Sequence, residues 1–223
     1  MPKLSTEEKK ALILDTCKEL FYKKGYTGTT YEDINTAAGL PPGSVTNYYS
    51  GKKALAETIH AEYEMKVKTA ISLLAGDDHE LRVMSALEII YWWQLFYTSP
   101  NIRRFIVEIS KEGILRKSLA GNTQHFFKQQ IDEYGIKMDS SRFKLVTNAY
   151  IGMVTALLLN ADENFSSHTA DEVADFVIES AYKMLNVDRA VIIDAINRAH
   201  GIYRGVKLSD AYYEFFKYDE TKL

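Results

Sequence analysis

The stretch GYTGTTYEDINTAAGLPPGSVTNYYSGKKAL, residues 25–55, decides the fold of this chain. It contains two short helical patterns on either side of a tight glycine turn. Thr29 and Thr30 precede the first pattern, and each has an acidic residue three positions later, as in a capping box. Gly39 ends this helix in the left-handed conformation that glycine adopts readily. Two short helices joined in this way predict a helix-turn-helix, whose second helix enters the DNA major groove.

The second helix is expected to begin near Pro41 or Pro42, because proline is favoured in the first turn of a helix. It runs to about Tyr49. Upstream, the capping box in residues 5–8 opens a further helix that has an apolar face at helical spacing. This face consists of Ile13, Cys17, Leu20 and Phe21, and it is expected to meet Ile34, Ala38 and Val45. The three helices predict a DNA-binding head that spans residues 1–51.

The head resembles the N-terminal domain of the TetR family of transcriptional regulators. The matching residues are Leu20-Phe21, Gly25-Tyr26, Thr29-Thr30, Asp33-Ile34, Ala37-Ala38-Gly39, Gly43-Ser44, Tyr48-Tyr49, Lys52 and Ala54-Leu55. The resemblance implies a dimer with an effector-binding and dimerisation domain, here residues 52–223. One departure concerns the second helix, which commonly reads K-G-T-L-Y-x-H-F in the family. Here Pro42, Val45, Thr46 and Asn47 leave it without Lys or Arg.

The overall charge does not by itself indicate a nucleic-acid partner, because the 223 residues carry a net charge of −3. A basic surface must therefore be local. Lysines do flank the motif, at positions 18, 23, 24, 52 and 53. The single cysteine, Cys17, excludes an internal disulfide and fits a reducing compartment. With no signal peptide or membrane-spanning apolar run, we expect a cytoplasmic protein without a membrane partner.

Six residues are candidate DNA contacts. Thr30, Tyr48 and Lys52 are expected to contact phosphates, by match to family positions and by their hydroxyl, phenol and ammonium groups. Ser44, Thr46 and Asn47 are candidate base readers. Asparagine can pair bidentately with adenine, and a threonine methyl can touch a thymine methyl. A contact to phosphate or water is an equal alternative for Asn47.

Beyond the head the pattern is helical nearly throughout, and no alternating strand pattern competes, so we predict an all-α protein. The expected helices cover residues 52–74, 80–97, 101–112, 114–134, 142–160, 170–185, 188–200 and 209–217. An interruption is expected near Gly121. Ser140-Ser141 and Thr169 are the expected N-terminal caps of two of these helices.

An aromatic cluster is the second informative feature. The candidate ligand-binding residues are Trp92, Trp93, Phe96, Tyr97, Phe126 and Tyr150. Core packing explains most of them, but Tyr91-Trp92-Trp93 covers much of a helix circumference. Some of these rings must therefore face a cavity or another subunit. Aromatic walls are usual in small-molecule sites, and the resemblance places the effector cavity here too. Because no cluster of Lys or Arg lies near Trp92-Trp93, we expect a largely apolar effector.

Two later helices are candidates for a dimer interface. Their apolar faces include Val154, Leu158, Val173, Phe176, Val177 and Met184. Two such helices from each of two subunits can form a four-helix interface, and the resemblance points to this pair. An intramolecular core is the alternative for either helix.

The chain has no Walker loop, G-x-S-x-G, H-E-x-x-H or paired-cysteine pattern, so we expect no catalytic residue, metal site or cofactor. Asp77-Asp78-His79-Glu80 is better explained as a helix cap in an exposed turn than as a metal or prenyl-transfer site. The chain is predicted to be a homodimeric, ligand-responsive repressor that leaves a pseudopalindromic DNA operator when a small molecule binds. The alternatives are an α-helical enzyme acting on an apolar substrate, and an activator or protein-binding regulator of the same fold.

Overall fold

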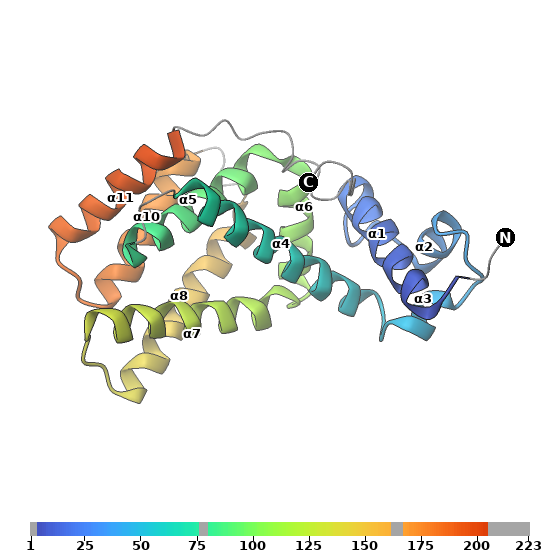
Figure 1. The fold of residues 1–223 in the computed structure, drawn as a ribbon, viewed down its shortest axis with the longest axis horizontal. Coiled ribbons are helices and arrows are strands. Elements are labelled where there is room, and N and C mark those ends of the chain that lie inside the picture. The colour runs from blue at the N-terminus through green and yellow to red at the C-terminus, as the bar shows by residue number, and fades with distance from the viewer. Residues whose placement is uncertain (1–3, 76–79, 162–166, 205–223) are drawn as a thin grey trace. The chain divides into compact units, whose positions relative to one another are not determined.

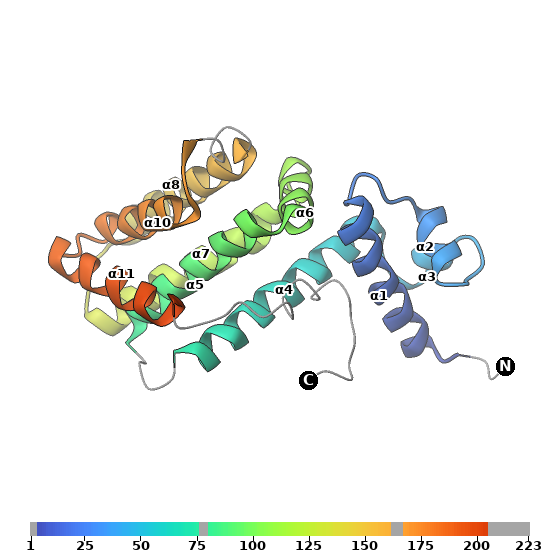
Figure 2. The ribbon, with the colours of Figure 1, turned by 90° about the horizontal axis from the view of Figure 1, so that it is seen from above.

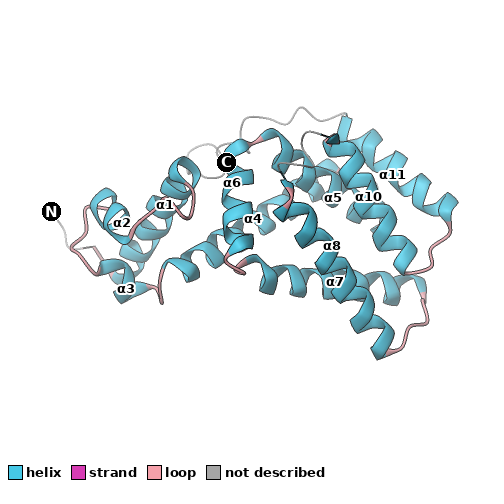
Figure 3. Ribbon diagram, turned by 180° about the vertical axis from the view of Figure 1, so that it is seen from behind, coloured by secondary structure: helices cyan, strands magenta, loops and turns pink. Residues whose placement is uncertain are grey.

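The computed structural model describes residues 4–75, 80–161 and 167–204, and within these ranges every regular element is a helix (Figures 1 and 3). The all-α expectation is therefore confirmed. The helices are α1 (Thr6–Lys24), α2 (Tyr31–Ala37), α3 (Ser44–Tyr48), α4 (Lys52–Leu74), α5 (Leu81–Thr98), α6 (Pro100–Lys111), α7 (Leu115–Tyr134), α8 (Ser140–Leu159), α10 (Ala170–Met184) and α11 (Arg189–Arg204). The expected helix at 209–217 and residues 77–79 lie outside the described residues.

The chain divides into two compact units. Among the described residues, the first unit consists of residues 4–63 and 99–115, and the second comprises 64–75, 80–98, 116–161 and 167–204. The first half of α4 and all of α6 therefore belong with the helix-turn-helix. The assignment of residues 1–51 as the DNA-binding domain and of 52–223 as the effector and dimerisation domain stays a prediction.

The core of the first unit forms where the sequence pattern predicts it. Ile13, Cys17 and Phe21 of α1 are completely buried, as are Ile34 of α2 and Val45 of α3. The other two expected members, Leu20 and Ala38, are half-buried. The capping box at Ser5 is confirmed, since its hydroxyl accepts from the Glu8 N–H and the Glu8 carboxylate accepts from the Ser5 N–H.

The two threonines before α2 have different roles. Thr30 is the N-cap and forms the capping box with Asp33. The Thr29 side chain is buried, and its hydroxyl donates to the carbonyl of Gly25 at 2.7 Å. Only Thr30 therefore caps α2, and Thr29 ties the preceding turn together.

The start of α3 differs from the expectation. Gly39 does adopt a left-handed φ of 62°, but Pro41 and Pro42 lie in a turn that precedes α3 and not in its first turn. Gly43, with a φ of 81°, is the N-cap and separates the prolines from the helix. The left-handed backbone at Gly43 interrupts the helical path, so the placement of the prolines within α3 was wrong.

Helix α6 packs against α1 in the first unit. The rings of Phe21 and Phe105 stack with centroids 5.6 Å apart. Arg104 donates to the carbonyl of Tyr22 at 2.6 Å, and the Glu108 carboxylate accepts from the Thr27 N–H at 2.9 Å. Two charged side chains of α6 thus satisfy backbone groups at the end of α1 and in the loop that leads to α2.

In the second unit, α5 packs against α10 and α11, and α8 lies beside α10 (Figures 2 and 3). Tyr91 of α5 and Tyr182 of α10 are completely buried. Helix α7 continues through Gly121, so the expected interruption does not occur. Asp139, not Ser140 or Ser141, caps α8, because its carboxylate accepts from the Arg142 N–H at 2.8 Å. The expected cap at Thr169 is confirmed.

The contact between Gly25 and α6 makes a test of this packing. Gly25 has a φ of 81° and a ψ of 169°, a region open almost only to glycine, and a Cβ there would lie 2.6 Å from the Glu108 Oε2 atom. We expect Gly25→Ala to lower stability by about 1–3 kcal/mol, measured as the urea midpoint.

The matched control is Gly113→Ala in the same unit. Gly113 also has a positive φ, 67°, but a Cβ there would meet nothing within 4 Å. It should be the milder substitution, at about 1 kcal/mol. Equal effects of the two substitutions would contradict the close approach of Glu108 to Gly25.

Candidate functional site

The exposed surface of α3 is the first candidate site. Thr46 and Asn47 are exposed, whereas Ser44 is only 7% exposed and its hydroxyl donates to the Pro41 carbonyl at 2.7 Å. The Thr46 hydroxyl donates to the carbonyl of Gly43 at 2.9 Å, so its methyl is the group that remains for a base. Of the three candidate base readers, Thr46 and Asn47 reach the surface, and Ser44 holds the turn.

Lys52 lies at the start of α4, and its ammonium is engaged within the first unit. Its Nζ atom donates to the carbonyls of Tyr26 and Thr29, both at 2.9 Å, and lies 4.4 Å from the centroid of the Tyr26 ring. An ammonium has three donor hydrogens, so one remains for a phosphate oxygen. Lys52 therefore has a structural role that its match to a family position did not predict.

Thr30, another of the phosphate candidates, lies beside an ion pair. Its hydroxyl donates to the Asp33 carboxylate, and the Lys24 ammonium lies 2.7 Å from that carboxylate. The hydrogen bond from Lys24, followed by those from Thr30, lowers the pKa of Asp33 to about 2. Asp33 is therefore ionised at neutral pH, and Lys24 balances a negative charge next to the expected phosphate contact.

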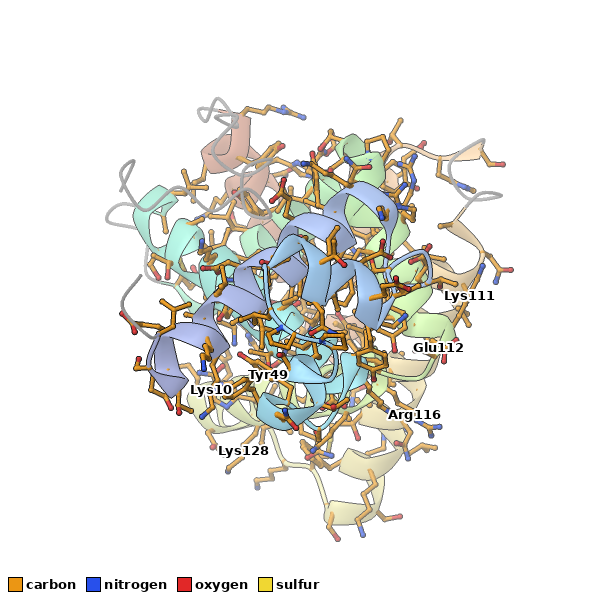
Figure 4. All side chains as sticks on the ribbon, turned by 90° about the vertical axis from the view of Figure 1, so that its right-hand side faces the viewer. Lys10, Tyr49, Lys111, Glu112, Arg116 and Lys128 are labelled. Carbon is orange, nitrogen blue, oxygen red and sulfur yellow. The ribbon has the colours of Figure 1, made fainter. Side chains whose placement is uncertain are left out.

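The N-terminal part of α1 adds basic groups near α3. The Tyr49 hydroxyl donates to the carbonyl of Lys10 at 3.0 Å, and Figure 4 labels both residues. Tyr48 is half-buried, and the Lys9 ammonium lies 6.0 Å from the centroid of its ring. Sequence reasoning considered only the lysines beside the motif and missed Lys9. A signal was available, because Lys9 follows the capping box at the exposed start of α1.

In the second unit, the aromatic residues of α5 contact one another. Trp92 stacks on Phe96 with centroids 5.4 Å apart, and Trp93 meets Trp92 edge-on at 5.2 Å and Tyr97 at 6.4 Å. Trp93 and Phe96 are buried, whereas Trp92 and Tyr97 are half-buried. Core packing therefore accounts for Trp93 and Phe96.

A second aromatic group joins α7 and α8. The ring of Phe126 stacks on that of Tyr150 at 6.3 Å, and Phe127 meets Tyr150 edge-on at 5.5 Å. Phe126 is half-buried and Tyr150 is buried. The six predicted ligand residues thus lie in two groups, each held together by ring contacts.

Polar side chains lie among these rings, and sequence reasoning did not single them out. The Glu64 carboxylate of α4 accepts from Trp92 Nε1 and from Asn122 Nδ2, both at 3.3 Å. Burial, and then the nearby charge of Glu88, raises the pKa of Glu64 to about 7. Burial also raises the pKa of Glu88. The signal for Glu88 was its place inside the apolar run ALEIIYWW, residues 86–93.

A depression of about 590 Å³ opens at the start of α5 and the end of α7. It is lined by Glu80, Leu81, Gln129, Asp132, Glu133 and Tyr134. None of the predicted ligand residues contributes to its walls. Glu80 also forms an ion pair with Arg198 of α11.

The residues expected at a dimer interface lie mostly inside the chain's own core. Val154, Leu158, Val173 and Val177 are buried, since α10 packs on both α5 and α8. Met184 is half-buried, and Phe176 is 54% exposed. The four buried side chains are therefore not available to a partner, and of the six only Phe176 is largely exposed.

The outward face of α8 is apolar and uncovered in the single chain. Leu145 is 61% and Leu159 42% exposed, and the small residues Ala149, Gly152 and Ala156 between them are exposed too. A Cβ at Gly152 would meet nothing within 4 Å. Another helix could therefore approach this face closely.

Two negative observations concern the described ranges. No group of three or more His, Cys, Asp or Glu side chains is arranged there to hold a metal ion. No helix in those ranges has the length and apolar character that a membrane span requires.

The comparison with protein families bears on the helix-turn-helix. Residues 13–59, which include α2, α3 and the start of α4, match the model for bacterial regulatory proteins of the tetR family. Over these residues the chain is similar to the N-terminal domain of TetR-family regulators. No curated protein matches the chain.

Solved structures extend the likeness to most of the chain. RolR in complex with resorcinol has a TM-score of 0.62 and 14% identity, and the match covers 87% of this chain and 94% of RolR. RolR without ligand has a TM-score of 0.60 and 13% identity, and the match covers 85% of this chain and 96% of RolR. A structure described as a TetR-family regulator from Syntrophomonas wolfei has a TM-score of 0.58 and 14% identity. The match covers 82% of this chain and 97% of that protein. At these identities the likeness shows the fold, and the expected helical head followed by a larger helical domain is confirmed.

Proposed function

We propose that this chain is a ligand-responsive transcriptional regulator that binds DNA as a homodimer, and that it is a repressor rather than an enzyme. The observation that carries the proposal is the TetR-family head, whose α3 exposes Thr46 and Asn47 at its surface. The family is one of regulatory proteins, which supports a regulatory rather than a catalytic role. Because its proposed partner is chromosomal DNA, the regulator would act in the cytoplasm.

On DNA, α3 would lie in the major groove, with Asn47 and the Thr46 methyl against base edges. Thr30, Tyr48 and Lys52 would contact phosphates, and Lys9 joins them because it lies beside Tyr48. Ser44 would act indirectly, by holding the turn that sets the start of α3. Since α3 has no basic residue, phosphate contacts must supply most of the affinity and base contacts most of the discrimination.

The dimer would form through the outward faces of α8 and α10. An uncovered stripe that runs from Leu145 to Leu159 with small residues between is suited to close helix packing. Phe176 of α10 adds a large apolar side chain that is 54% exposed to water. Two-fold symmetry of the protein would then require a pseudopalindromic operator with half-sites about 34–36 Å apart.

The effector would bind among the aromatic residues of the second unit, where Trp92, Tyr97 and Phe126 keep part of their surface accessible. RolR, a structural relative, has been solved with resorcinol, a small aromatic molecule. This supports a similarly small, largely apolar effector here. A ligand can change DNA affinity only if it binds the two functional states differently. Helix α4 runs from Lys52 in the first unit to Leu74 in the second, so a shift at one end can reach the other.

DNA selection from a random pool tests the DNA assignment. Wild-type protein should enrich a pseudopalindrome. Lys52→Ala should weaken binding to all sequences alike and lower the salt slope by about one, since it removes one phosphate contact. Asn47→Ala should instead reduce discrimination at one base position of each half-site by about 1–3 kcal/mol.

Each variant serves as the control for the other. Circular dichroism must first show that Lys52→Ala is folded, because this ammonium also holds two carbonyls. An altered sequence preference for Lys52→Ala with an unchanged salt slope would refute its phosphate role.

Light scattering tests the dimer. Phe176→Glu should yield monomers, because it buries an unpaired charge in an apolar contact, and operator binding should fall with it. Asn197→Glu, at an exposed position on α11, is the control and should stay dimeric. Intact dimers of Phe176→Glu would rule out this face of α10. A charged substitution at Val177 would not test the interface, since that side chain lies in the core of the unit.

Operator release by a panel of apolar small molecules tests the effector site. Phe126→Ala should weaken release by active compounds while leaving operator affinity within about twofold, because the ring lies in the second unit. Phe143→Ala, another half-buried phenylalanine of that unit, is the matched control. The same loss in both variants would point to general destabilisation, and no loss in either would place the site elsewhere.

A further inference from the structure

Polar groups from three helices meet among the aromatic side chains of the second unit. Glu64 of α4 accepts hydrogen bonds from Trp92 of α5 and Asn122 of α7. Burial raises the pKa of Glu64 and of Tyr150 in α8, and the nearby charge of Glu88 in α5 raises both further. The helices that supply these residues are labelled in Figure 1. Two carboxylates therefore share one partly apolar space.

Ionising Glu64 and Glu88 in this environment costs free energy, because both carboxyl groups are partly removed from water. The donors from Trp92 and Asn122 are neutral and lie 3.3 Å from the Glu64 carboxylate, the long end of hydrogen-bond distances, so each compensates its charge only weakly. Lys68 favours the ionised form of both carboxylates, and His125 favours that of Glu88. Burial nevertheless outweighs these charges, because the pKa of each carboxyl is raised.

The side chains around these carboxylates keep part of their surface exposed, and α7 adds a further polar group. Glu64, Glu88, Trp92, Asn122 and Phe126 are all only half-buried. Thr123 is 3% exposed, and its hydroxyl has no hydrogen-bond partner among the described residues. It lies one turn before Phe126, on the same face of α7. Since buried hydroxyls are nearly always hydrogen-bonded, a polar ligand atom would complete this one.

We propose that this space recognises an effector with an apolar aromatic body and one positively charged nitrogen, which faces Glu64 and Glu88. The assignment rests on the proposed function, since it names the class of effector for the same aromatic site. A cation relieves the repulsion between the two carboxylates, which no neutral ligand does. The faces of Trp92, Phe126 and Tyr150 attract a cation as well. An anionic ligand of the same shape would be repelled.

The pH dependence of binding follows from the carboxyl groups. Glu64, with a pKa of about 7, is mostly neutral at pH 6 and mostly ionised at pH 8. A cation binds the ionised form, so its affinity should rise about tenfold between these two pH values. The other charged groups that act on these carboxylates are Lys68 and His125. In Glu64→Gln the rise should therefore largely disappear.

Three compounds with one body test the charge preference: 4-phenylbutylamine, 4-phenylbutanol and 4-phenylbutanoate, which are cationic, neutral and anionic at pH 7.5. Trp92 and Trp93 are the 2 tryptophans of the sequence, so intrinsic fluorescence reports on the site directly, with calorimetry as a second measurement. We expect the amine to bind at least about tenfold more tightly than the alcohol, and the carboxylate to bind most weakly.

Substitution of the two glutamates tests whether they cause the preference for the amine. Glu64→Gln and Glu88→Gln should each weaken amine binding about tenfold or more and leave alcohol binding within about twofold. Glu133→Gln, which removes an exposed carboxylate on α7, should match wild type. Two glutamate variants on different helices keep the test valid if one of them fails to fold.

Three outcomes overturn the inference: equal or tighter binding of the alcohol or carboxylate in wild type, an amine preference that survives both substitutions, or binding of none of the compounds. The fluorescence measurement does not involve DNA. If the amine binds in a manner that depends on Glu64 but leaves operator affinity unchanged, the ligand class stands and the proposed ligand response fails.

Discussion

The orientation of the helix-turn-helix depends on how the backbone between α1 and α2 satisfies its hydrogen bonds. This connection turns sharply at Gly25, whose N–H still bonds to the Phe21 carbonyl of α1, and backbone groups beyond it bond to side chains of other helices. Lys52 of α4 donates to two of the carbonyls, and Glu108 of α6 accepts from the Thr27 N–H. Side chains from two later helices therefore hold one short loop, and α2 and α3 follow from it.

This constraint explains why α6 belongs to the same compact unit as the head. Phe105 stacks on Phe21, and Arg104 and Glu108 bond to backbone on either side of Gly25. Burial of the rings supplies non-directional stabilisation, whereas the charged side chains fix the register of α6 along α1. Helix α6 is thus bonded to the first unit, although α5 before it and most of α7 after it belong to the second.

Helix α4 carries both a candidate DNA-contacting residue, Lys52, and a candidate ligand-binding residue, Glu64. Near its start, Lys52 organises the loop before α2, and Glu64 lies one residue after the first unit ends. The residue that would sense a ligand charge and the residue that would face phosphate are therefore on one continuous helix. A regulator needs such a connection, because a ligand acts on DNA affinity only through an element common to both sites.

Local chemistry let the sequence predict much of the fold. The capping boxes at Ser5 and Thr30, the cap at Thr169 and the turn at Gly39 depend on residues within four positions of one another, and each forms as expected. Helix periodicity likewise placed α4 at residues 52–74 and identified the buried face of α1.

Some features depended on tertiary structure. These are positions where two neighbouring residues could cap a helix, and apolar faces that could pack either within the chain or against a partner. Thr30 caps α2 because the Thr29 side chain is buried and bonds to the carbonyl of Gly25. The prolines lie outside α3 because Gly43 is its N-cap. The periodicity of α8 and α10 revealed apolar faces but not that Val154 and Val177 would be covered by the same chain. The proximity of Glu64 and Glu88 was invisible for the same reason, since it arises from how α4 and α5 lie within the unit and not from any spacing along the chain.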